Sequence, residues 1–179
     1  MNDARNQTQY QIRFDWGMDG AAAIAPGAHI VIWADALQTS GAPDITTLDT
    51  DATVLAGTVG SRAAVARWVL ARQTELGGRA VVAVVAAGTD DGRFAVEDLL
   101  AAGAVIDAIA ALGIDFVSPE AAAAIGAYEG LRNATNHVLS ASVTGKQLAA
   151  SGDVEVLAAA RVANTNDELR ILKESKPGA

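Results

Sequence analysis

The chain has 179 residues, 51% of them hydrophobic, with a formal net charge of −8 and no cysteine. Its length is sufficient for one sizeable domain with its own core. The acidic balance argues against nonspecific binding to nucleic acid or to an anionic membrane, which needs a basic face, and the lack of cysteine excludes disulfides, thiolate nucleophiles and cysteine-based metal sites.

The same features set expectations for location and partners. Residues 1–8 are polar, which does not resemble a signal peptide, and no apolar run approaches the roughly 20 residues of a transmembrane helix. We therefore expect a single cytoplasmic domain over residues 1–179, with no nucleic-acid or membrane partner. An anionic substrate would need a local positive group or a metal ion in so acidic a protein.

The first part of the chain predicts two strands with a short helix between them. Polar and apolar residues alternate over 9–16, which is typical of a half-buried strand at an edge or in an antiparallel pair. Residues 18–25 favour a helix that stops at Pro26, and residues 29–33 favour a buried strand. Asp35 follows that strand, where metal and substrate ligands are common. The alternative role of Asp35 is to cap the next turn.

A polar loop over residues 41–51 leads to a second strand-to-helix unit. Residues 52–56 favour a strand and residues 61–76 a helix, with the loop Gly57-Thr58 between them. Amides at a helix N-terminus can bind an oxyanion, and Arg62 would add a positive charge there. The alternative is an ordinary connection with Arg62 in solvent.

Residues 80–113 are the most informative stretch. The apolar run 81–87 predicts a strand buried on both faces, Gly88-Thr89 opens a turn, and a helix runs from Val96 towards Gly113. Ligands in open α/β sheets lie beyond the carboxyl ends of the strands, where Gly88 and Thr89 are expected.

Two acids open the predicted helix. Glu97 and Asp98 either complement the helix dipole or help to hold a divalent cation, since hard cations prefer carboxylate oxygens. Adjacent side chains on a helix point about 100° apart, so we expect only one of the two to reach a given ion.

The remaining residues predict further helices. Ser118-Pro119 reads as a capped helix start, with helices expected over residues 121–139 and 153–161 and a terminal strand over 169–172. Strands alternate with helices along the chain, which predicts an α/β fold with three layers, a sheet between helices on both faces. The strand order cannot be read from the pattern.

One long motif resembles a known family. Residues 87–104 read Ala-Gly-Thr-x-x-Gly-x-Phe-x-x-Glu-Asp-x-x-x-Ala-Gly-Ala, which is similar to the signature of the 2-phosphosulfolactate phosphatase (ComB) family. Members of this family are magnesium-dependent phosphatases. Residues 13–21, 57–66 and 140–152 resemble the family more loosely. The resemblance implies a ComB-like α/β/α domain.

The resemblance, together with acids placed at strand ends beside two glycine loops, suggests roles for a small set of residues. Asp35, Glu97 and Asp98 are the candidate Mg²⁺ ligands, Asp35 and Arg62 the candidate catalytic residues, and Gly57, Thr58, Gly88 and Thr89 the candidate substrate-binding residues. The substrate would be a small phosphorylated organic acid.

The chain also departs from the family. The family motif Asp-Val-Leu-Arg-Ala-Thr-Thr reads Asp35-Ala-Leu-Gln38-Thr-Ser here, so glutamine replaces an arginine that can bind an oxyanion with two hydrogen bonds. The family segments Gly-Glu-Arg-Asn-Gly and Thr-Asn-Gly-Thr have no counterpart. A second hypothesis is therefore a catalytically weakened relative that serves as a binding or oligomeric scaffold, with an alanine-rich apolar surface and the option of a homo-oligomer.

Overall fold

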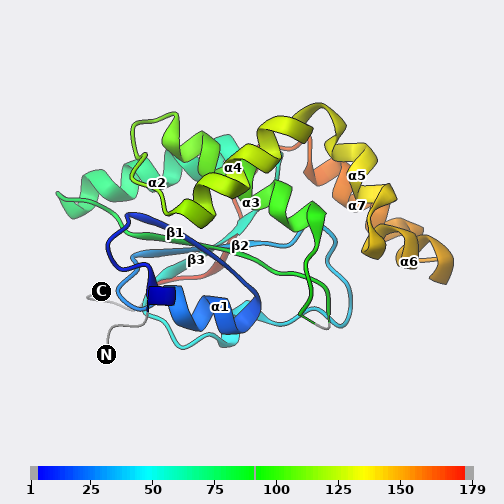
Figure 1. The fold of residues 1–179 in the computed structure, drawn as a ribbon, viewed down its shortest axis with the longest axis horizontal. Helices are drawn as coiled ribbons and strands as arrows, with labels where there is room; N and C mark the ends of the chain where they lie inside the picture. The colour runs from blue at the N-terminus through cyan, green and yellow to red at the C-terminus, as the bar shows by residue number, and fades with distance from the viewer. Residues whose placement is uncertain (1–3, 91, 176–179) are drawn as a thin grey trace.

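The computed structural model describes residues 4–90 and 92–175, and within them five strands form one sheet (Figure 1). The order across the sheet is β1 (Ile12–Trp16), β4 (Val82–Ala86), β2 (Ile30–Ala34), β3 (Thr53–Gly57) and β5 (Ile171–Lys173). The first four strands are parallel, and β5 is antiparallel to β3. The predicted α/β class is confirmed.

Helices cover the two faces of the sheet unequally. The α-helices are α1 (Gly17–Ile24), α2 (Arg62–Leu76), α3 (Val96–Ala110), α4 (Pro119–Leu131), α5 (Thr135–Ala141), α6 (Val143–Ser151) and α7 (Val154–Ala163). Three 3-10 turns are η1 (Ala4–Asn6), η2 (Ile45–Thr47) and η3 (Arg132–Ala134). Figure 1 shows α1 below the sheet and α2, α3 and α4 above it.

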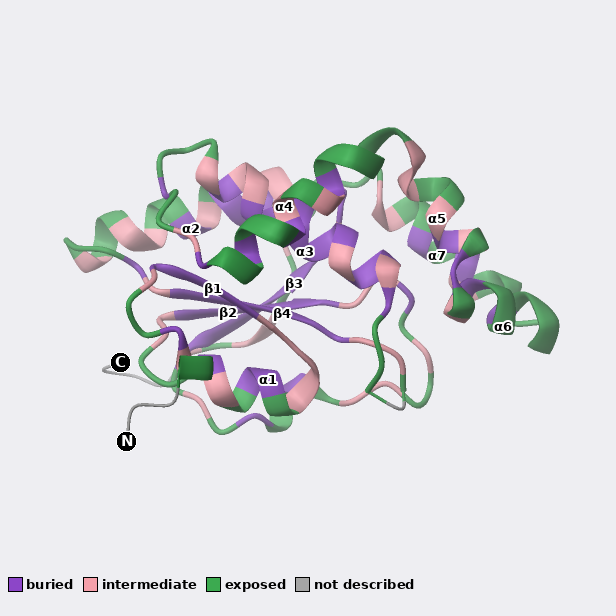
Figure 2. Cartoon of the chain, viewed as in Figure 1, coloured by how far each residue is buried: buried purple, intermediate pink, exposed green. Residues whose placement is uncertain are grey.

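Alternate residues of the parallel strands build two cores. Ile30 and Ile32 of β2 pack against α2, α3 and α4, whereas Val31 and Trp33 pack against α1. This split follows from the two-residue period of a strand. Every residue of β2, β3 and β4 is buried (Figure 2), which confirms the burial predicted for the strands at residues 29–33 and 81–87.

The outer edge of β1 is closed by side chains and loops. The Gln7 side-chain amide donates to the Phe14 carbonyl at 2.8 Å and accepts from the Phe14 N–H at 3.0 Å. The Trp16 N–H donates to Asp15 Oδ1 at 2.8 Å, and the Ile12 N–H donates to the Phe116 carbonyl at 3.1 Å. The sequence correctly predicted an edge strand here, although its pairing with β4 is parallel.

A close contact holds α3 against α4. Gly103 of α3 lies so near the backbone of α4 that a Cβ there would collide with the Ala124 carbonyl. By contrast, Gly126 of α4 has no atom within 4 Å of a Cβ placed on it. Close packing of these two helices therefore depends on the missing side chain of Gly103.

The helix predicted over residues 121–139 is wrong in its extent. The chain forms α4, the turn η3 and then α5, with Leu131 at φ −118° and ψ 4° where α4 gives way to η3. Gly130, Asn133 and Thr135 are weak helix formers, which lowers the cost of this break. The predicted Ser118 cap is confirmed, since the Ser118 hydroxyl accepts from the Ala121 N–H at 3.1 Å.

Helices α5, α6 and α7 lie beyond the carboxyl ends of the parallel strands (Figure 1). Leu37, from the loop after β2, packs in a buried cluster with Leu139, Leu148, Leu157 and Ala160 of these helices. This small core attaches the three helices to the edge of the sheet where functional loops gather. Within the described residues, no helix is both long enough and apolar enough to cross a bilayer.

Candidate functional site

The acids that the sequence singled out meet at one edge of the sheet. Asp35 follows β2, and Glu97 and Asp98 lie in the first turn of α3, which follows β4. Because β2 and β4 are parallel neighbours, their carboxyl ends lie side by side. Ala36 and Asp98 are 62 positions apart in the sequence, and a hydrogen bond from the Ala36 N–H to Asp98 Oδ1 joins them directly.

Asp98 connects the loops after β2 and β4. Its Oδ1 accepts the Ala36 N–H at 2.7 Å and its Oδ2 accepts the Gly88 N–H at 2.9 Å. The side chain is 3% exposed, and burial raises the pKa of Asp98 well above its usual value, with the Asp35 charge as the next cause. Asp98 thus fixes the geometry of both loops.

The surroundings of Asp35 disfavour its ionised form. Burial raises the pKa of Asp35 from 3.8 to about 6, and the charges of Asp90 and Glu97 raise it further, while hydrogen bonds from Trp33 and Leu37 oppose the change. The site therefore gathers more negative charge than it neutralises with its own cations. A bound cation would relieve this repulsion.

Glu97 is buried without a partner. Its side chain is 4% exposed, and no described residue donates a hydrogen bond to it or pairs with it as an ion. Its charge acts on both Asp35 and Asp98. No other group of the described residues holds this carboxylate, so it is available to a cation at this edge of the sheet. Across residues 4–90 and 92–175, no set of three acid, histidine or cysteine side chains is arranged to hold a metal ion.

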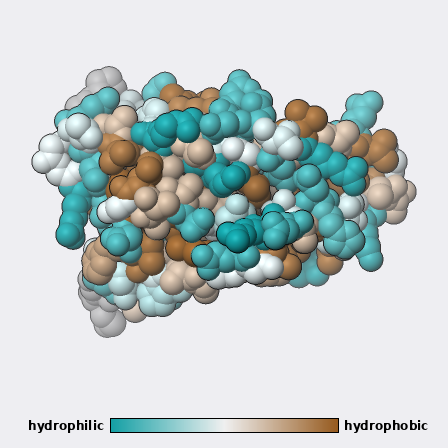
Figure 3. All heavy atoms as spheres, turned by 90° about the horizontal axis from the view of Figure 1, so that it is seen from above, coloured by the Kyte–Doolittle hydropathy of each residue, from teal (hydrophilic) through white to brown (hydrophobic). Residues whose placement is uncertain are grey.

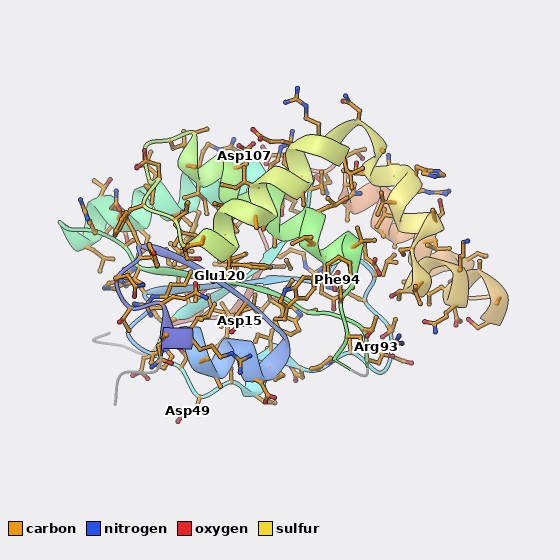
Figure 4. The ribbon with its side chains drawn as sticks, in the orientation of Figure 1. Asp15, Asp49, Arg93, Phe94, Asp107 and Glu120 are labelled. Carbon is orange, nitrogen blue, oxygen red and sulfur yellow. The ribbon has the colours of Figure 1, made fainter. Side chains whose placement is uncertain are left out.

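Two cavities lie at this end of the sheet, and Asp35 lines the smaller one. A cavity of about 270 Å³ is lined by Asp35, Gln38, Thr58, Arg170 and the small residues of α7. A larger one of about 480 Å³ lies between the loops after β2 and β4 and the helices α6 and α7. Its lining includes Thr39, Ser40, Thr89, Asp90, Arg93, Thr144, Gln147 and Asp153. Figure 4 shows Arg93 on the loop after β4, at the edge of the sheet that faces these helices.

The glycine loops do not present the backbone donors that the sequence suggested. The Gly88 N–H donates to Asp98, the Thr89 N–H donates to the Arg93 carbonyl at 2.9 Å, and the Thr58 N–H donates to Ser61 Oγ at 3.0 Å. The backbone of these loops is therefore used to hold the loops themselves. Thr58 and Thr89 still line the cavities, and their hydroxyls also donate within the loops, to Ser61 Oγ and to the Arg93 carbonyl.

Gly57 has a packing role. As the last residue of β3, it leaves room for its neighbours, because a Cβ on Gly57 would lie 2.8 Å from Ile32 Cγ2 and 3.5 Å from Val105 Cγ2. The position accepts no larger residue without a shift in the core. A direct role of Gly57 in binding a substrate stays a prediction.

Arg62 interacts with groups other than Asp35. Its guanidinium donates to the Val59 carbonyl, and its charge acts on Asp167. Arg62 is absent from the described lining of the cavity beside Asp35, whereas Arg170 is part of it. Sequence reasoning missed Arg170 because only the strand order, which places the start of β5 beside the end of β3, brings it to the site.

Another cavity, of about 590 Å³, lies beside the edge strand β1 and is lined by residues of β1, α3 and α4. Its walls are mainly apolar, with Phe14, Trp16, Phe94 and Leu99, and Figure 4 shows Asp15, Phe94 and Glu120 around it. Asp15 is held there by Arg5, whose Nε lies 2.7 Å from Asp15 Oδ2. Its larger volume does not make it the better candidate, because the buried acids Glu97 and Asp98 and the raised pKa of Asp35 are found at the other site.

Comparison with known families identifies the chain. The family model described as 2-phosphosulpholactate phosphatase, a variant spelling of the name used above, matches residues 36–175. The chain belongs to this family. The match contains Glu97, Asp98 and Arg170 and begins directly after Asp35. A comparison with curated protein sequences found no match.

Proposed function

We propose that this member of the 2-phosphosulfolactate phosphatase family is a magnesium-dependent phosphoric monoester hydrolase that acts on a small phosphorylated organic acid. The observation that carries the proposal is the pair of Glu97 and Asp35. Glu97 is a 4% exposed residue whose carboxylate forms no hydrogen bond or ion pair with the described residues, and the pKa of Asp35 is raised to about 6. Such a pair favours a bound cation. Family membership supports phosphate ester hydrolysis as the chemistry.

The residues present suit Mg²⁺. This ion is usually bound through one or two carboxylates, with water and substrate phosphate as the other ligands. Asp35 and Glu97 would supply the two carboxylates, and Asp98, whose two oxygens each accept a backbone N–H, would set the position of the loop that carries Asp35. Bound Mg²⁺ neutralises phosphate charge and lowers the pKa of coordinated water.

The protein's own groups would position the substrate. Thr58 lines the cavity beside Asp35, and Thr89 lines the neighbouring one. To bind a phosphoryl oxygen, each hydroxyl would exchange the hydrogen bond that it now donates, to Ser61 Oγ at 3.1 Å or to the Arg93 carbonyl at 3.3 Å. Helices α6 and α7 form outer walls of these cavities, α7 of both and α6 of the larger one. This arrangement would restrict the access of bulk water, which strengthens electrostatic interactions with a bound phosphate.

Hydrolysis and ion binding test the proposal together. We expect release of inorganic phosphate from 2-phosphosulfolactate with Mg²⁺ and none with EDTA. Glu97→Gln should weaken Mg²⁺ binding and activity by about 10- to 100-fold or more. That range is found when a group that only supports a metal ligand is removed, and Glu97 would be a ligand itself. Glu129→Gln is the matched control, because Glu129 is exposed on α4.

Two results would change the conclusion. If the wild-type protein releases no phosphate from any short phosphorylated acid, the hydrolase proposal fails. If it then still binds Mg²⁺ in calorimetry, a weakened relative that serves as a binding protein becomes the better account. The apolar surface expected for such a scaffold is not continuous on the face shown in Figure 3, where hydrophobic atoms form separate small areas.

A further inference from the structure

A phosphorylated acid carries two anionic groups, and both need donors. The amides of Gly88, Thr89 and Thr58 already donate within the protein. Arg62 is turned to the Val59 carbonyl, and Gln38 is uncharged. Arg93 lines only the larger cavity, so a cation in the cavity beside Asp35 must come from another part of the chain.

The fold places the positively charged Arg170 beside the end of β3, in the cavity that Asp35 lines. It directly precedes β5, and because β5 is antiparallel to β3, the start of β5 lies at the carboxyl end of β3. The Ala56 N–H donates to the Arg170 carbonyl at 2.9 Å, which fixes the backbone of Arg170 beside the end of β3. The position of the Arg170 backbone is thus fixed by the pairing of β5 with β3.

The Arg170 side chain is available for a ligand. It is exposed, it lines one cavity with Asp35, Gln38 and Thr58, and it lines a second with Gln38, Thr58 and Ser61. Within the described part of the chain, no carboxylate pairs with its guanidinium and no hydrogen bond from it is found. Gln38 and Arg170 thus share the same cavities.

The strand order separates charge across the site. The strands β4, β2, β3 and β5 lie next to one another in this order. Glu97 and Asp98 follow β4, Asp35 follows β2, and Arg170 directly precedes β5. Neighbouring strands lie about 4.8 Å apart, so β2 and β5 are about 10 Å apart, and a long arginine side chain spans much of that interval. A short molecule could therefore contact the acid side with one end and Arg170 with the other.

We propose that Arg170 binds the carboxylate of the substrate at the end remote from the phosphoryl group, and so selects phosphorylated acids over other phosphate esters. This inference rests on the proposed hydrolase function. The planar guanidinium matches a carboxylate with two parallel hydrogen bonds. Ala159, Ala160 and Ala163 of α7 line the same cavity of about 270 Å³, which suits a short carbon chain.

Binding of a non-hydrolysable probe tests this role without relying on turnover. Phosphonoacetate carries a phosphonate and a carboxylate, and propylphosphonate is its counterpart without the carboxylate. With Mg²⁺ present, calorimetry should show that the wild-type protein binds phosphonoacetate about 10- to 100-fold more tightly, the range for a charge-assisted hydrogen-bonded pair. Arg170→Ala should abolish this preference, and Arg170→Lys should keep part of it.

A matched control and a kinetic readout separate binding from folding. Arg161→Ala removes an exposed arginine from α7 and should leave the preference unchanged. Arg170→Ala should raise KM at least about tenfold for phosphoglycolate, the loss of one charge-assisted pair, and leave the hydrolysis of p-nitrophenyl phosphate, which has no carboxylate, close to that of the wild type. Its thermal unfolding should match that of the wild type, since the Arg170 side chain is exposed and forms no hydrogen bond or ion pair with the described residues.

The possible results distinguish the two proposals. If the wild type prefers phosphonoacetate and Arg170→Ala keeps that preference, the role of Arg170 is overturned whether or not the protein hydrolyses esters. If Arg170→Ala loses the preference but the wild type hydrolyses nothing, the hydrolase proposal fails and the carboxylate subsite stands. If the wild type shows no preference, the subsite is overturned.

Discussion

Replacing Asp35 by asparagine should stabilise the magnesium-free protein at neutral and alkaline pH. The Asp35 carboxyl is held in a buried, negatively charged site that raises its pKa from 3.8 to about 6. One pKa unit corresponds to about 1.4 kcal/mol, so ionised Asp35 costs the folded state about 3 kcal/mol. An asparagine side chain at this position would have a similar shape and no charge, and it would remove this cost.

The pH dependence gives the sign of the effect. An acid whose pKa is higher in the folded state favours folding fully below its unfolded pKa of 3.8, and this contribution is lost as the pH rises through about 6. The stability of the wild type should therefore fall between about pH 4 and pH 7 on account of Asp35. Asp35→Asn should show no advantage at about pH 4 and an advantage of about 3 kcal/mol at about pH 8.

Thermal unfolding in EDTA measures this difference. For a domain of this size, about 1 kcal/mol corresponds to about 2–4 °C in Tm, so we expect Asp35→Asn to raise Tm by about 6–12 °C at about pH 8. Added Mg²⁺ should then stabilise the wild type and have little effect on the variant. A Tm of the variant in EDTA, at this pH, that is equal to or below that of the wild type would refute the electrostatic reasoning.

Four further substitutions, one of them a control, test packing and hydrogen bonds at the site and between α3 and α4. Asp98→Asn should destabilise the protein by about 1–3 kcal/mol in urea unfolding, because an amide can accept only one of the two N–H groups that Asp98 now accepts; equal or greater stability would contradict this. Gly103→Ala should cost about 2 kcal/mol or more, roughly the cost of overpacking, whereas Gly126→Ala, in open space, should gain about 0.5–1 kcal/mol. Ser118→Ala should lower the free energy of unfolding by about 1 kcal/mol through loss of a buried helix cap, and an unchanged free energy would contradict this role.

The strands and most helices could be predicted because their signals are local. The apolar runs behind β2, β3 and β4 and the Ser118 cap leave few alternatives. The break between α4 and α5 could not be predicted, because the contact of Leu139 with Leu37 in the small core under α5–α7 depends on residues far apart in the sequence. Tertiary packing of this kind overrides local propensity.

The candidate site was predictable only in part for the same reason. The sequence indicated that Asp35 and Glu97 follow strands, and the structure brings the two into one electrostatic group. It gave no order for the strands, so Arg170 was not connected with Asp35 and the positive charge was assigned to Arg62. Side-chain hydrogen bonds such as those of Asp98 depend on the same spatial order.

The pairing of Gln7 with Phe14 has a consequence for self-association. An exposed strand edge can template the addition of a strand from another molecule, which leads to fibres or exchanged dimers. Here the carboxamide of Gln7 occupies both the donor and the acceptor that Phe14 would offer to an incoming chain. A homo-oligomer of this protein would thus have to be built by contacts other than continuation of the sheet past Phe14, and losing this one side chain would remove a safeguard against aggregation.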